Sequence, residues 1–327
     1  MRYTLPLFLG LALALPAAPA HAISQKSESE APPAPSSAEA FADYQRGEFK
    51  SAFTKATALA EKGDSAAQTL LGLLYHRGLG TGRDDARAIE WYSKAALAGD
   101  REAQFSLGLM VVRGEGTVKD PAKAAGWFAA AAEQGHLEAH YNLALIYVAG
   151  DGVEQDLEKA AELFTFGAEK GHAESQYNLG ALYADGRGVP KDMARAAYYI
   201  GLAAAQRMPA AEVEYALMVL RGDSVEKDEK KARALFKSAA ERGNVVAQNR
   251  LARMLAVGIG GDADPVEAVK WHLVARRAGL DDGWLDGFIA SLSSEQEAEA
   301  RKRAQEYVAP VQRQSSLRSI APDRRNG

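Results

Sequence analysis

The sequence of 327 residues contains no cysteine. Disulfides, a lipid attached to a processed N-terminal cysteine and a cysteine nucleophile are therefore excluded. The net charge is only −4, so the chain lacks the basic excess of proteins that bind nucleic acid mainly through phosphates. Hydrophobic residues at 47% and charged residues at 25% are ordinary values. We expect a chain of this length to be stabilised by its core alone.

Long apolar runs are also missing. The N-terminal run Leu5–Leu15 has 11 residues, whereas a membrane-spanning helix needs about 20. Small residues follow it at Ala20 and Ala22, as a signal peptidase site requires. We predict that residues 1–22 are a cleaved Sec-type signal peptide and that the mature protein is periplasmic or secreted. An uncleaved N-terminal anchor is the alternative.

A period of 36 residues without gaps organises most of the remaining chain. One column is leucine in most copies, the next column is glycine or alanine, and a glycine follows six positions later. This later glycine column comprises Gly78, Gly114, Gly150, Gly186, Gly222 and Gly258. Six copies run from about residue 63 to residue 278. A period of this length with two helix-length halves per copy indicates an α-solenoid.

Aspartate marks the start of each second half. This column comprises Asp84, Asp120, Asp156, Asp192, Asp228 and Asp264. Aspartate is a favoured N-cap because its carboxylate accepts free N–H groups of the first helical turn. Between Gly186 and Asp192 lies a second glycine, Gly188, in the stretch YADGRGVPKD. We predict that the two glycines make the turn and that Asp192 caps its own helix.

The recurring pattern A-x-x-x-L-G-x-x-Y-x-x-G-x-G-V-x-x-D-x-x-K-A-x-x-W-Y-x-x-A-A-x-x-G resembles the Sel-1-like repeat, a relative of the tetratricopeptide repeat. Residues 68–99 and 176–205 match it best, and the resemblance covers about two thirds of the chain. It implies an all-α fold, a right-handed solenoid of antiparallel helix pairs, and a role in binding other proteins. Many bacterial members of the family are exported.

The ends of the chain fit a capped array. The predicted organisation is a signal peptide at 1–22, a flexible linker at 23–40, N-terminal capping helices at 41–62, six repeats at 63–278, C-terminal capping helices at 279–308 and a disordered tail at 309–327.

The glycine-rich loops and two histidines are candidate ligand sites. A glycine loop before a helix could hold a phosphate or a cation, but no loop ends in Gly-Lys-Ser/Thr. His136 and His140 have a spacing that can hold zinc, yet both occupy ordinary polar columns of the repeat. The sequence also lacks a Gly-x-Ser-x-Gly elbow. We predict no catalytic residue, no metal and no cofactor.

By analogy with tetratricopeptide arrays, one stripe of each first helix lines a concave groove. In the middle repeats this stripe carries a row of acids beside a row of aromatics, namely Glu102, Glu138 and Glu174 and Phe105, Tyr141 and Tyr177. Such a groove suits a partner segment with basic and apolar side chains. Alternatively, the aromatics fill the seams between repeats.

The fifth copy departs from the pattern. Arg207 replaces its closing glycine, Tyr215 the leucine and Ser224 the second loop glycine. We predict that residues 207–228 form the least stable part of the array.

Together these features predict an exported, non-catalytic scaffold that binds a protein or peptide, without a role for nucleic acid or a stable membrane span. One alternative is a periplasmic regulator that inhibits a sensor kinase or an envelope enzyme. A cell-wall hydrolase is a less favoured alternative, because the motifs of a nucleophile or a metal site are missing. The sequence leaves the oligomeric state open.

Overall fold

The computed structural model describes residues 36–308. The predicted signal peptide, most of the predicted linker and the predicted tail at 309–327 lie outside these residues. The described part of the chain is helical and contains no strand, which confirms the all-α prediction.

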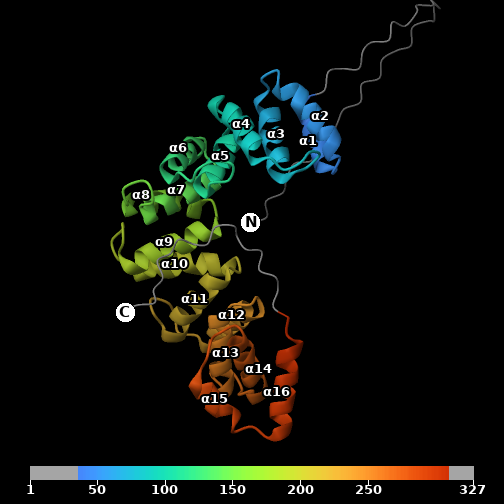
Figure 1. Cartoon of the computed structure of the whole chain (residues 1–327). Helices are drawn as coiled ribbons and strands as arrows, with labels where there is room; N and C mark the ends of the chain where they lie inside the picture. Colours follow the sequence, from blue (N-terminus) through green and yellow to red (C-terminus); the bar gives the residue numbers. More distant parts are fainter. Residues whose placement is uncertain (1–35, 309–327) are drawn as a thin grey trace, which may run out of the picture. The chain divides into compact units, whose positions relative to one another are not determined.

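The helices follow one another along the chain (Figure 1). Their bounds are α1 Ser37–Gln45, α2 Phe49–Ala60, α3 Ser65–Arg77, α4 Asp85–Leu97, α5 Arg101–Arg113, α6 Pro121–Glu133, α7 Leu137–Ala149, α8 Leu157–Glu169, α9 Ala173–Asp185, α10 Met193–Ala205, α11 Pro209–Arg221, α12 Glu229–Glu241, α13 Val245–Val257, α14 Pro265–Arg277, α15 Gly283–Ile289 and α16 Ser294–Glu306.

Six helix pairs, from α3 and α4 to α13 and α14, correspond to the six predicted repeats. From α1 to α14 each helix packs mainly on its neighbours in the chain, whereas α16 packs on α14 rather than on its neighbour α15. The helix α1 begins at Ser37, so the last four residues of the predicted linker, 37–40, are helical. Ser36 caps this helix by accepting the N–H of Glu39 at 3.3 Å.

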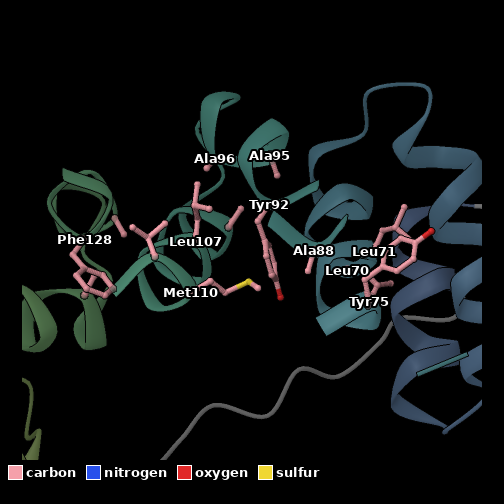
Figure 2. Packing of buried hydrophobic residues seen from close by; sticks show 14 of the residues in the cluster. Leu70, Leu71, Tyr75, Ala88, Tyr92, Ala95, Ala96, Leu107, Met110 and Phe128 are labelled. Atoms are coloured by element: carbon pink, nitrogen blue, oxygen red, sulfur yellow. The ribbon is translucent and has the colours of Figure 1, made fainter. Parts of the chain in front are cut away.

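Within a pair, a small residue of the first helix faces a large residue of the second. A Cβ atom added to Gly108 would lie 2.7 Å from the ring of Phe128, and one added to Gly180 would lie 2.6 Å from Ile200. Figure 2 shows Phe128 and Tyr92 among the buried aliphatic side chains of two successive repeats. The glycine and alanine column thus allows the close approach on which the core of each pair depends.

Turn and cap residues lie where the repeat pattern places them. Gly186 and Gly188 both adopt the left-handed conformation, each at φ +69°. Asp192 Oδ1 accepts the N–H of Arg195 at 2.9 Å. In all six repeats the aspartate before the second helix accepts the backbone N–H of the residue three positions later. These aspartates are Asp84, Asp120, Asp156, Asp192, Asp228 and Asp264.

Replacing Asp192 with alanine is expected to lower the free energy of unfolding by about 1 kcal/mol, because an N–H of the first turn of α10 loses its acceptor. Urea unfolding followed by circular dichroism measures the change. Asp192→Asn is the matched control and should stay within a few tenths of a kcal/mol, since asparagine caps equally well. Equal losses in the two variants would contradict the capping role.

The fifth repeat holds two strained positions. Arg207 and Ser224 have φ values of +63° and +58°, and no other described residue except glycine has a positive φ. Both stand in columns where the other repeats have glycine. The N-cap of α11 is Met208, which makes no side-chain capping bond. This repeat keeps the backbone of its neighbours with residues that are poorly suited to it.

Arg207→Gly is therefore expected to raise the free energy of unfolding by about 0.5–1 kcal/mol, the left-handed strain being partly offset by the greater freedom of glycine in the unfolded chain. Arg207→Ala keeps the strain and should give no gain.

Hydrogen exchange of the wild type should show residues 207–228 less protected than residues 176–205. Equal protection would contradict the predicted weakness of this junction.

Candidate functional site

The predicted acid row lies on the surface of three consecutive first helices, α5, α7 and α9. The side chains of Glu102, Glu138 and Glu174 are 58%, 55% and 43% exposed. Each stands in the first turn of its helix, where the positive end of the helix dipole favours a carboxylate.

The three glutamates also contact the residues that cap the first helices. His136 Nε2 lies 3.2 Å from Glu102 and His136 Nδ1 lies 3.3 Å from Glu138. His172 Nε2 lies 3.4 Å from Glu174. The histidines are buried or half-buried, but the carboxylates themselves are exposed to water and salt, which screen such contacts. The carboxylates can therefore exchange these contacts for a partner's cation at little cost.

His136 and His172 are the N-caps of α7 and α9. The N–H of Ala139 points to His136 Nδ1 at 3.2 Å, and that of Ser175 to His172 Nδ1 at 3.3 Å. His140 stacks on Phe166 with ring centroids 3.8 Å apart. Residues 36–308 contain no group of three or more His, Cys, Asp or Glu side chains that could hold a metal ion.

The aromatic row packs in the seams between repeats. The ring of Phe105 stacks on His136 at 4.3 Å and lies 5.9 Å from Phe128 of its own repeat. Tyr141 makes the equivalent contacts one repeat later, 5.0 Å from His172 and 5.9 Å from Phe164.

Burial, with a smaller effect of Glu174, raises the pKa of Tyr141 to about 12. Tyr177, the third member of the row, is half-buried and packs against the core around α10. The rings thus mainly join one repeat to the next, and the acids are the exposed part of the predicted site.

Aliphatic side chains continue this surface along the first helices. We call the first-helix face the three glutamates together with the half-buried aliphatics of the two neighbouring columns, Leu73, Leu109, Val112, Val148, Leu217 and Leu220. Partly exposed apolar groups beside exposed acids can contact both the stem and the head of a lysine or arginine.

A ladder of side-chain amides, which the sequence pattern alone did not reveal, links the repeats. Gln104 Nε2 donates to the carbonyl of Ala96 at 3.2 Å, and Gln134 Nε2 donates to Gln104 Oε1 at 2.8 Å. Gln176 and Gln206 repeat the second bond at 2.8 Å. The polar column at 36-residue spacing was the available signal.

In the fifth repeat an ion pair replaces the amide link. Glu212 is buried, contacts Arg242 and accepts a bond from Ser238 at 2.9 Å. Burial raises the pKa of Glu212 against the opposing effects of Ser238 and Arg242. This charged link is a further departure of the fifth repeat from its neighbours.

The glycine loops support the turn-and-cap interpretation over a phosphate or cation site. A Cβ added to Gly188 would lie 2.1 Å from the carbonyl oxygen of Leu157 in the preceding repeat. The loop is thus packed against protein backbone, and the Asp192 carboxylate is engaged by its own helix. None of the helices in the described part of the chain is long and apolar enough to cross a membrane.

Comparison with known proteins agrees with the repeat geometry. A family model described as Sel1 repeat matches six consecutive segments, residues 65–100, 101–136, 137–172, 173–207, 209–244 and 245–280. No curated protein sequence matches the chain significantly.

Two solved structures resemble the chain over most of its length. A Sel1 repeat protein from Oxalobacter formigenes is 28% identical, with 75% of this chain and 98% of that one covered and a TM-score of 0.66. The protein c5321, a protective antigen present in uropathogenic Escherichia coli strains and displaying an SLR fold, is 27% identical, with coverage of 82% and 68% and a TM-score of 0.57. Sel1 repeat proteins are typically scaffolds for protein–protein interactions and generally non-catalytic. With six matched repeats and the same succession of helix pairs, the chain belongs to the Sel1 repeat family.

Proposed function

We propose that this protein is an exported, non-catalytic scaffold whose first-helix face binds a protein or peptide segment carrying basic and apolar side chains. The observation that supports it best is the row of exposed glutamates, Glu102, Glu138 and Glu174, one repeat apart and beside partly exposed aliphatics. Binding depends on shape and charge, and no reaction is involved.

The charge pattern favours an extended partner. Carboxylates that recur once per repeat match cations that recur along a segment, and such complementarity raises the association rate and selects the sign of the partner. The aromatics contribute by joining the repeats that carry the acids, because Phe105 and Tyr141 each contact the cap of the following first helix. The row is thereby attached to a packed surface.

The test is a binding measurement with a fluorescent peptide of alternating lysine and leucine. Changing Glu102, Glu138 and Glu174 together to lysine should weaken binding at least tenfold, with a smaller difference at high salt. The matched control changes Glu61, Glu133 and Glu169 to lysine. These three acids are exposed near the ends of second helices, so the net charge changes equally. Unchanged binding in the first variant, or an equal loss in both, would contradict the proposal.

Export is supported by residues outside the described range, namely the apolar run Leu5–Leu15 followed by Ala20 and Ala22. Intact mass measurement of the protein recovered from its native host should give a chain that starts at Ile23. A chain that retains residues 1–22 would contradict cleavage.

A further inference from the structure

A second apolar surface lies at the C-terminal end of the array. A cavity of about 270 Å³ opens there, with walls that include Leu220, Met254, Val257, Ile259 and Trp284. Two of these side chains are unusually exposed for their type, Trp284 at 47% and Val257 at 55%. We call this cavity the C-terminal cleft. Its size suits one large apolar side chain of a ligand.

Two arginines, Arg250 and Arg253, form the polar part of the wall of the C-terminal cleft. Arg253 stands in a column where the other five repeats have leucine or alanine, and Val257 stands where three of them have arginine. The exchange of apolar and basic residues is specific to the sixth repeat. It places positive charge beside an exposed apolar surface.

An aspartate organises this corner. Asp282 is buried and accepts bonds from Arg253 at 2.6 and 2.8 Å and from Asn249 at 2.7 Å. It also accepts the N–H of Trp284 at 3.1 Å, and the Arg253 guanidinium lies 5.5 Å from the Trp284 ring centroid. The tryptophan and one arginine are thus held in place by a single carboxylate.

The charges of the cleft do not cancel. Asp282 neutralises Arg253, whereas the exposed side chain of Arg250 makes no ion pair or hydrogen bond within residues 36–308. One positive charge therefore remains beside an apolar cavity. A ligand that fills the cavity and carries a carboxylate would satisfy both features.

We propose that the C-terminal cleft binds an acidic peptide segment in which a large apolar side chain stands next to a carboxylate. The apolar side chain enters between Val257 and Trp284, and the carboxylate pairs with Arg250. A peptide is favoured over a free small acid because Leu220 belongs both to the cleft and to the first-helix face. In that respect the inference rests on the proposed function. The two surfaces then select opposite charges, so one partner segment would run from a basic part to an acidic, apolar part.

Fluorescence anisotropy with three labelled peptides tests this site in the full chain. The peptides have equal length and carry phenylalanine between glutamates, phenylalanine between lysines, or alanine between glutamates. The first should bind wild-type protein at least tenfold more tightly than the third. Arg250→Glu should weaken the first peptide at least tenfold. Lys62→Glu, an equal charge change on an exposed residue between α2 and α3, should leave it unchanged.

Any of three results would overturn the proposed binding by the C-terminal cleft. The first is equal affinity for the glutamate peptides with phenylalanine and with alanine, and the second is an unchanged affinity of Arg250→Glu at an unchanged melting temperature. The third is binding of N-acetylphenylalanine as tight as that of the phenylalanine peptide. The test is separable from that of the first-helix face. The variant with lysine at Glu102, Glu138 and Glu174 should still bind the acidic phenylalanine peptide. If this variant retains wild-type binding of the lysine–leucine peptide while Arg250→Glu abolishes binding of the acidic one, the first-helix proposal fails and the cleft stands.

Discussion

Gly188→Ala is expected to lower the free energy of unfolding by about 3–4 kcal/mol, although the substitution removes no contact and adds only a methyl group. Two causes add. A residue other than glycine at φ +69° is strained by about 1–2 kcal/mol. The new Cβ would also lie 2.1 Å from the carbonyl oxygen of Leu157, and a backbone atom cannot rotate away as a side chain can.

The matched control is Gly171→Ala. Gly171 has φ +84°, but nothing lies within 4 Å of the position of its Cβ. Its cost should therefore be the backbone strain less the unfolded-state freedom that alanine lacks, about 0.5–1 kcal/mol. Urea unfolding of both variants, each against the wild type, measures the difference. If the two alanines cost the same, the close packing of the loop on the preceding repeat has no energetic weight and this account of Gly188 is wrong.

Asp282→Ala is expected to cost about 3 kcal/mol, because it leaves Arg253 and Asn249 without their shared acceptor and uncaps α15. Since Arg253 remains partly exposed, the loss should lie at the low end of the range for broken buried pairs. Asp281→Ala is the control. The carboxylate of Asp281 is exposed and makes no hydrogen bond or ion pair within the described residues. The free energy of unfolding should therefore change by no more than about 0.5 kcal/mol.

The same aspartate predicts a pH dependence. The bond from Arg253 is the largest effect that holds the pKa of Asp282 well below its usual range. Because the folded pKa is lower than the unfolded value of about 3.9, the stabilisation is complete above that value and is lost as the pH falls below it. The stability difference between wild type and Asp282→Ala should therefore narrow between pH 4 and about pH 2. A difference that stays constant over this range would contradict the assignment.

The local features of this protein follow from the chain alone. An N-cap such as Asp192 bonds to a residue three positions away, and a turn glycine such as Gly186 is required by the left-handed conformation of its own backbone. Both requirements are satisfied within a few residues, and the 36-residue period repeats them six times. For that reason the helix pairs, their caps and the irregular fifth repeat could be predicted without a structure.

The candidate binding surfaces depend on contacts of a different range. Phe105 meets His136, and Arg253 meets Asp282, across about thirty residues of sequence. A column of aromatics looks the same whether it lines a groove or fills a seam, because the pattern states which residues share a helix face and not what that face packs against. Stacking one repeat on the next assigns Phe105 and Tyr141 to the seams, leaves the glutamates exposed, and joins Trp284 to the arginines of α13. Those positions required the packed helices, since each results from the free energy of burying side chains between repeats.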